Sequence, residues 1–281
     1  MTSDINYSDI LKEKWHKKKI CLLVLQGSSC SGKTTIANFI NDKLKNQYKV
    51  DVISTDNYYK DFPYDLTAET LSKYDFDNPA ALDWELLEKT LFEYALESKT
   101  ITKYSYDFNT KKKTAVVVKN MRPQILIIEG IYSFNLFNQK KFNIPEFDCL
   151  KTRKEHNFTE EFIMNNSDIS SYFEILFVQL KLPKELMKKI RINRDVEHRY
   201  KNTTKEFLRV LEARFEKLIW PSTVAWVYNQ HNRPDILIEG GSFNEKNCCS
   251  LCKGIFEFLL LEDKNGGDFV SSIMNKIYVS K

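Results

Sequence analysis

The chain has 281 residues, 42% of them hydrophobic and 28% charged, and its 42 basic and 38 acidic residues leave a formal charge of +4. This composition excludes collagenous, disulfide-scaffold and fully disordered proteins, and so small a net charge argues against a nucleic-acid partner. The longest apolar runs are too short to cross a bilayer, and the first residues lack the apolar stretch of a secretory signal, so we expect a cytoplasmic protein with no membrane partner.

Short apolar runs alternate with helical segments along the chain. Strands are predicted at residues 20–25, 50–54, 124–128, 174–180 and 235–238, and helices at 33–47, 82–97, 183–200, 205–228 and 247–261. Strands that are apolar throughout are typical of a parallel sheet covered on both faces. The alternation therefore predicts an α/β fold with a doubly wound, five-stranded parallel sheet.

Other segments fall outside this alternation. Residues 1–19 are expected to form a polar lead-in, helical or partly disordered, before a main domain at 20–262, and 263–281 a C-terminal tail. Two β runs around a lysine-rich turn predict a hairpin at 99–119, set apart from the main sheet and placed to act as a substrate flap. Residues 138–171 lack periodicity, and we expect an insertion that forms a mobile surface loop.

The strongest local signal lies between the first strand and the first helix. Residues 27–34 read GSSCSGKT and match the pattern GxxxxGK[ST] in the strand-to-helix context that the pattern requires. Backbone N–H groups and the helix N-terminus bind phosphate there, while Lys33 reaches the β and γ phosphates and Thr34 offers a hydroxyl to Mg²⁺. The expected nucleotide-binding set is Gly27, Ser28, Ser29, Cys30, Ser31, Gly32, Lys33, Thr34 and Thr35.

Two acidic residues follow predicted strands, at the sheet edge where ligands bind in open α/β proteins. Asp56 comes after the second strand, and we expect it to be the general base that accepts the proton of an attacking hydroxyl. Glu129 follows the third strand and is expected to hold Mg²⁺ together with Thr34 and Asp56. Either acid alone could instead be a solvated or helix-capping residue.

Two further groups of residues admit both a functional and a plain structural interpretation. Arg191 and Arg194, three residues apart on a predicted helix within the 183–215 region, could form a cationic lid that neutralises the transferred phosphoryl group, or a solvated basic face. Cys249 and Cys252 form a CxxC pair with no second pair elsewhere, so we interpret them as small hydrophobic residues of a helix and not as a metal site.

Seven motifs occur in the order found in the uridine-cytidine kinase family of P-loop nucleoside kinases, which the sequence resembles. They are GSSCSGKT, STDNYYK, YDFDNPAALDWELL, YSYDF, ILIIEGIYSF, RINRDVEHR and PDILIEGG. The resemblance implies a P-loop NTP-hydrolase fold with a hairpin flap and a helical lid. It also implies phosphorylation of the 5′-hydroxyl of uridine or cytidine by ATP or GTP with Mg²⁺, in a homo-oligomer, either a dimer or a tetramer.

The resemblance assigns roles to individual residues. Asp56, Lys33, Arg191 and Arg194 would be catalytic, and Arg199 would contact the nucleotide. Asp77 would bind the ribose hydroxyls, and the nucleoside pocket would consist of Tyr59, Phe76, Tyr106, Phe108 and Lys111. Many family members have a histidine where this chain has Lys111, and a lysine has hydrogen-bond donors only, so it can meet a carbonyl but cannot accept from the cytosine amino group.

Two alternative functions remain. One is transfer to another small alcohol, as in the related phosphoribulokinases and pantothenate kinases, and Lys111 is the reason to consider it. The other is a nucleotide-binding protein that has lost catalysis and acts as a regulatory or scaffold partner, against which the intact Lys33, Thr34, Asp56 and Glu129 argue. A GTPase is excluded because no NKxD segment is present.

Overall fold

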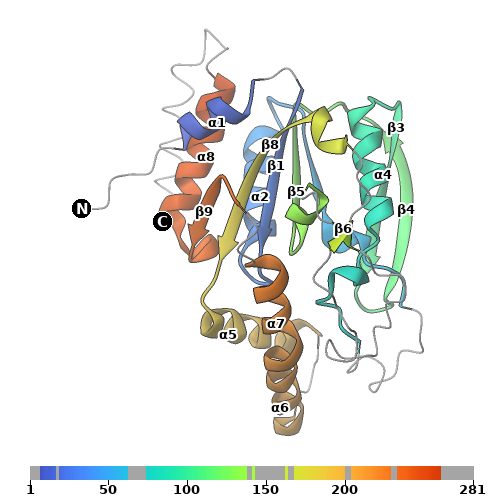
Figure 1. The fold of residues 1–281 in the computed structure, drawn as a ribbon, viewed down its shortest axis with the longest axis vertical. Helices are drawn as coiled ribbons and strands as arrows, with labels where there is room; N and C mark the ends of the chain where they lie inside the picture. Colours follow the sequence, from blue (N-terminus) through green and yellow to red (C-terminus); the bar gives the residue numbers. More distant parts are fainter. Residues whose placement is uncertain are drawn as a thin grey trace.

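A five-stranded parallel sheet organises the protein (Figure 1). The computed structural model describes residues 7–16, 19–62, 74–137, 141–142, 162–163, 168–199, 204–228 and 233–260. The sheet has the order β2-β5-β1-β8-β9, and all four neighbouring pairs are parallel. Its strands are β1 (Ile20–Gly27), β2 (Val50–Ser54), β5 (Ile125–Gly130), β8 (Phe173–Lys181) and β9 (Ile236–Glu239). The predicted strands and sheet type are confirmed.

The central strands are buried on both faces, which explains why they are apolar at every position. Along β1, Leu23 and Leu25 pack on one side and Leu22 and Val24 on the other. The first side is covered by α2 (Lys33–Leu44) and α8 (Glu245–Leu260), and the second by α4 (Trp84–Ala95). Figure 1 shows α8 and α4 on opposite sides of the sheet. A parallel sheet is stable in this arrangement because both faces are removed from water.

The N-terminal segment differs from the expected polar lead-in. Helix α1 (Ser8–Lys14) lies against α8, and Tyr7, Leu11 and Trp15 are buried in the same core as α2 and α8. These three residues are four apart, so they share one face of the segment. The polar residues between them conceal this short apolar stripe in the composition, and the described part of the segment belongs to the main domain.

The predicted hairpin forms as a separate antiparallel sheet. Its strands are β3 (Thr100–Asp107) and β4 (Lys112–Lys119), with Asp107 opposite Lys112 next to the turn. Ile101 of β3 packs in the core that covers the α4 face of the main sheet. The hairpin therefore packs against α4, and its turn lies near the carboxyl end of the main sheet.

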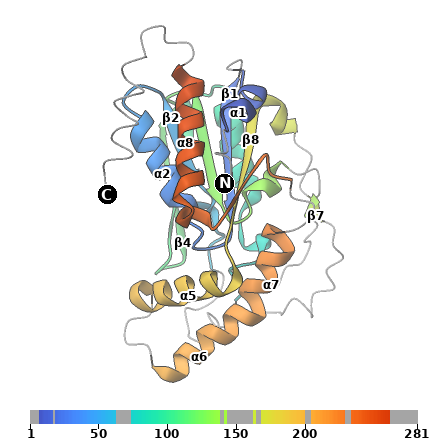
Figure 2. The ribbon, with the colours of Figure 1, turned by 90° about the vertical axis from the view of Figure 1, so that its left-hand side faces the viewer.

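The helical region after β8 extends beyond the carboxyl ends of β1 and β8 (Figures 1 and 2). Helix α5 (Lys184–Arg194) continues as the π-helical η5 (Asp195–Arg199). The second helix consists of α6 (Lys205–Arg214), η6 (Phe215–Ile219), α7 (Trp220–Ser222) and η7 (Thr223–Val227), where η6 and η7 are π-helical. Pro221 lies between the two π segments, and a proline cannot donate the regular helical hydrogen bond.

The remaining described elements are short. They are the 3₁₀ turns η1 (Thr55–Tyr58), η2 (Pro79–Ala81), η3 (Ser133–Leu136), η4 (Asp168–Tyr172) and η8 (Gly241–Phe243), and the paired strands β6 (Lys141–Phe142) and β7 (Phe162–Ile163). The predicted 138–171 insertion is described only at 141–142, 162–163 and 168–171, and the predicted tail at 263–281 lies outside the described residues.

Cys252 packs beside Leu251 and Ile255 in the core, as expected of a small hydrophobic residue. Within the described ranges, no three histidine, cysteine, aspartate or glutamate side chains gather as a metal cluster. The helices in the same ranges include none with the length and apolar character needed to span a bilayer.

Candidate active site

The phosphate loop joins β1 to α2 and depends on two glycines. Gly32 has φ +86°, and a Cβ on it would lie 1.9 Å from Ser242 Oγ. A Cβ on Gly27 would lie 2.6 Å from the Leu180 carbonyl oxygen. Glycine is required at both positions because the backbone approaches its neighbours too closely for a side chain. The loop therefore has the compact backbone that a phosphate cradle needs.

A second turn supports the loop from outside. The Ser242 N–H donates to the Ser31 carbonyl at 2.8 Å, and Gly241, with φ +57°, lies so close to that carbonyl that a Cβ would be 2.5 Å away. Sequence analysis did not assign a role to these two residues. The only signal was the PDILIEGG motif, which ends at Gly241 and directly precedes Ser242.

Lys33 and Glu129 lie at the base of the loop. Lys33 is buried, and its ammonium group donates to the Ser28 carbonyl at 2.9 Å. Burial lowers the pKa of Lys33, while the negative charges of Glu129 and Asp56 act in the opposite direction. The predicted catalytic lysine therefore lies within the field of both predicted acids.

Glu129 is the penultimate residue of β5 and accepts hydrogen bonds from two hydroxyl groups. Its Oε1 accepts from Thr34 Oγ1 at 3.1 Å and from Ser54 Oγ at 2.6 Å. Burial raises the pKa of Glu129, the charge of Lys33 opposes this, and the charge of Asp56 reinforces it. A hydroxyl and a carboxylate are oxygen ligands of the kind that Mg²⁺ prefers. Thr34 and Glu129 thus fit the metal role that the sequence predicts for them.

A cavity of about 270 Å³ opens beside the loop and contains most of the predicted acceptor-binding residues. Its lining includes Ser29, Asp56, Tyr59, Phe76, Asp77, Phe108, Lys111, Arg191 and Arg194 from the predicted sets. Asp56 reaches it from η1, directly after β2. The lining therefore combines a residue of the phosphate loop, a carboxylate and residues of the hairpin turn.

Tyr106 is the predicted pocket residue that does not line this cavity. It is buried behind Tyr59 and Phe108, with ring centroids at 5.5 Å and 5.2 Å. It supports the aromatic wall from behind. Burial also raises the pKa of Tyr106.

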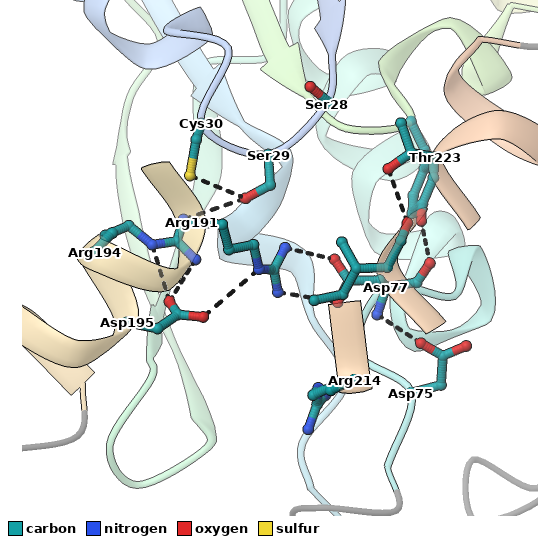
Figure 3. A network of polar contacts seen from close by, with 12 residues as sticks. Ser28, Ser29, Cys30, Asp75, Asp77, Arg191, Arg194, Asp195, Arg214 and Thr223 are labelled. Carbon is teal, nitrogen blue, oxygen red and sulfur yellow. Dashed lines mark hydrogen bonds and ion pairs between the residues drawn. The ribbon is translucent and has the colours of Figure 1, made fainter. Parts of the chain in front are cut away.

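The structure pairs two residues that sequence analysis placed in different roles. Arg191 of α5 makes a bidentate ion pair with Asp77, with Nη1–Oδ1 and Nη2–Oδ2 distances of 2.9 and 3.1 Å (Figure 3). Burial works against the charge of Asp77, but the charges of Arg191 and Arg214 leave its pKa below the usual range. Two parallel charge-assisted hydrogen bonds fix both side chains at the cavity wall.

Arg194 contacts the phosphate loop. Its Nη1 donates to Ser29 Oγ at 3.2 Å, while its Nη2 lies 2.8 Å from Asp195 Oδ1, as Figure 3 shows. Asp195 also lies 3.6 Å from the Nε of Arg191, so one carboxylate connects both arginines. Both arginines line the cavity, and their role in charge neutralisation stays a prediction. The side chain of Arg199 lies outside the described part of the chain.

Arg214 and Asp75 join the site without having been predicted. Arg214 of α6 lines the cavity, donates to the Tyr74 carbonyl at 2.9 Å and lies 5.9 Å from the Phe76 ring centre. Asp75 is buried next to Asp77, and burial together with the charge of Asp77 raises the pKa of Asp75 to about 7. No local sequence signal places Arg214 here, because its position depends on how α6 returns over the cavity.

Lys111 occupies the hairpin turn at φ +56°. Its ammonium group donates to the Phe108 carbonyl and lies 5.2 Å from the Phe76 ring centre and 5.8 Å from that of Phe108. A lysine in this position presents N–H donors to the cavity next to aromatic faces.

A phosphate loop at the end of β1, an oxygen pair suited to Mg²⁺ and an adjoining acceptor-sized cavity define a P-loop kinase. Residues 22–143 match the phosphoribulokinase/uridine kinase family. The chain is 37% identical over 116 residues to the uridine kinase of Mycoplasma pneumoniae, covering 41% of this chain and 53% of that one. It is 30% identical over 151 residues to the uridine kinase of Aliivibrio fischeri, covering 50% and 69%.

The chain belongs to the phosphoribulokinase/uridine kinase family. It spans about half the length of the first curated relatives that it matches. A solved structure from Silicibacter sp. TM1040, described as a candidate fructose transport system kinase, aligns with a TM-score of 0.54 at 16% identity, covering 83% of this chain and 99% of that one. This last likeness concerns the fold alone. Family membership implies a nucleotide as phosphate donor.

Proposed function

We propose that the protein transfers the γ-phosphoryl group of ATP or GTP to the 5′-hydroxyl of uridine or cytidine, with Asp56 as the general base. The observation that carries the proposal is a cavity lined together by Ser29 of the phosphate loop, by Asp56 and by aromatic and charged residues of the predicted acceptor site. An acceptor in this cavity lies between a carboxylate and the loop that holds the donor. The resemblance of the sequence motifs and the names of its relatives support the choice of acceptor.

The reaction needs positioning and charge stabilisation more than covalent chemistry. Asp56 accepts the proton of the attacking hydroxyl. Lys33, which lies against the Ser28 carbonyl, and Arg194, which lies against Ser29 Oγ, stabilise charge on the phosphoryl group. Thr34 and Glu129 would hold Mg²⁺, which would supply positive charge to the phosphates when bound.

The acceptor site suits a sugar carrying neighbouring hydroxyl groups. Asp77 provides acceptor oxygens and Arg191 provides donors, and their ion pair presents both at the cavity wall. A diol donates to the first and accepts from the second. The cavity volume of about 270 Å³ is close to the lower end of the range of small-molecule sites, about 300–1,000 Å³, so it suits a single small acceptor.

A second candidate is transfer to a different small alcohol. Lys111 favours it, because an ammonium group in the hairpin turn can bind a carbonyl or an anionic group of an acceptor that is not a pyrimidine nucleoside. The two candidates share the phosphate loop, Asp56 and the metal pair. They differ only in what occupies the cavity.

The test is ADP formation from MgATP, or GDP from MgGTP, with a panel of nucleosides and sugar alcohols. We expect stimulation by uridine or cytidine that is lost in Asp56→Asn and retained in Asp42→Asn, a matched change on the exposed surface of α2. Because general base catalysis typically contributes about 10²–10⁴-fold, the Asp56 variant should lose at least about 100-fold in kcat. Stimulation by another alcohol alone selects the second candidate. Nucleotide binding without stimulation by any alcohol rejects both.

A further inference from the structure

Tyr228 links the phosphate loop to the end of the helix formed by α6, η6, α7 and η7, which is called the second lid helix below. It directly follows η7, and its hydroxyl donates to Ser28 Oγ at 2.9 Å while accepting from the Leu182 N–H at 2.8 Å. Ser28 is fully buried within the loop. One hydroxyl therefore connects the lid helix, the phosphate loop and the residue that leads into α5.

The residue before Tyr228, Val227, is hydrogen-bonded to two side chains of the main sheet. The Val227 carbonyl accepts from Gln26 Nε2 at 3.3 Å and from Gln179 Nε2 at 2.7 Å. Both glutamines are buried at the carboxyl ends of the central strands β1 and β8. Because two buried donors converge on one carbonyl, the C-terminal end of the helix is anchored while α6 extends away from the sheet.

The link continues from Ser28 to the phosphate-binding groups. The Ser28 carbonyl accepts from Lys33 Nζ at 2.9 Å, and the next residue, Ser29, accepts from Arg194 at 3.2 Å. Two adjacent serines of the loop are thus held by the two helices of the lid region, Ser28 from the end of η7 and Ser29 from α5. A shift of Ser28 displaces the partner of Lys33.

We propose that Tyr228 is a positioning residue for the phosphate donor, whose hydroxyl sets the phosphate loop at a defined distance from the anchored end of the lid helix. The inference rests on the proposed function only in that the loop binds a nucleoside triphosphate, and it is independent of the acceptor. Tyr228 is not part of the described cavity lining, so it acts through Ser28 and Leu182. Burial raises the pKa of Tyr228, which keeps its hydroxyl protonated as a donor.

The experiment measures nucleotide affinity directly, by calorimetry with the magnesium complex of a non-hydrolysable ATP analogue. Tyr228→Phe removes the hydroxyl and keeps the ring, and Ser28→Ala removes the other partner of the same bond. Loss of a buried hydrogen bond costs about 1–3 kcal/mol, so we expect the nucleotide Kd to rise about 5- to 160-fold in each variant. The matched control is Tyr172→Phe, which removes a hydroxyl at the far end of β8 and should leave the Kd unchanged.

The double variant separates this role from a general structural one. If both residues act through one contact, Tyr228→Phe combined with Ser28→Ala should raise the Kd no more than the larger single change. The KM for the acceptor should stay within about twofold of wild type. The proposal is overturned by a nucleotide Kd within twofold of wild type in Tyr228→Phe, by effects that multiply in the double variant, or by an equal rise in acceptor KM. A chain that binds the analogue but phosphorylates no nucleoside contradicts the proposed function and leaves this test intact.

Discussion

Burial raises the pKa of Asp75 so far that the folded protein keeps this carboxyl protonated at mildly acidic pH. Burial and the neighbouring charge of Asp77 raise the pKa of Asp75 from 3.8 to about 7, against the opposing charge of Arg214. In Asp75→Asn, a neutral amide replaces the carboxyl, and its oxygen can still accept from the Asp77 N–H, which lies 3.1 Å from the present carboxylate. The change therefore removes the ionisation and keeps the contact.

The sign of the effect follows from proton linkage. Between pH 3.8 and about 7 the unfolded chain has lost the Asp75 proton and the folded chain has kept it, so the free energy of unfolding falls as pH rises. Above pH 7 Asp75 is ionised in both states, and the loss of stability caused by its buried charge is complete. The pKa of Asp75 differs by about three units between the folded and unfolded chains, and each unit corresponds to about 1.4 kcal/mol. Ionisation of Asp75 can therefore lower the free energy of unfolding by at most about 4 kcal/mol.

The assay is urea unfolding of wild type and Asp75→Asn at pH 4.5 and pH 8. We expect the free energy of unfolding of the variant, relative to that of wild type, to be about 2–4 kcal/mol higher at pH 8 than at pH 4.5. The control Asp42→Asn, at an exposed carboxylate, should show no such gain. A pH-independent difference between wild type and Asp75→Asn would refute the reasoning, because it would mean that Asp75 ionises in the folded protein as it does in the unfolded chain.

Three further changes test other parts of the structure. Gly32→Ala places a Cβ 1.9 Å from Ser242 Oγ at φ +86°, whereas Gly240→Ala at φ +87° meets its nearest atom at 3.4 Å. Both variants carry roughly 1–2 kcal/mol of backbone strain from their positive φ. We expect Gly32→Ala to lower the free energy of unfolding by more than this amount and to weaken nucleotide binding. Equal losses of stability for the two variants in thermal unfolding would exclude the close contact with Ser242 as the cause. Lys111→His supplies a ring nitrogen that can accept a hydrogen bond, so the ratio of kcat/KM for cytidine over uridine should rise, and unchanged relative rates would contradict the assigned role of Lys111. Trp15→Ala removes a side chain that is 1% exposed and should cost about 3–5 kcal/mol in urea unfolding, whereas a loss below about 1 kcal/mol would show that α1 is not part of the core.

The candidate site divides into a part that the sequence predicts and a part that it does not. The phosphate loop could be predicted because its function lies in contiguous residues whose backbone geometry follows from the positions of Gly27 and Gly32. The predicted acids Asp56 and Glu129 both act on Lys33 at the expected edge, because the carboxyl ends of parallel strands lie together. The pairing of Arg191 with Asp77 could not be predicted, since the two residues are 114 positions apart.

The sequence alone determined the alternation of strands and helices, the parallel sheet and the phosphate loop, because apolar periodicity and glycine spacing act over a few neighbouring residues. Only the tertiary structure decided that α1 completes the core, that Arg214 closes over the cavity, and that Tyr228 reaches Ser28 across 200 positions of the chain. These contacts depend on the directions in which helices return over the end of the sheet. No local pattern encodes such directions, because they result from the packing of all the layers together.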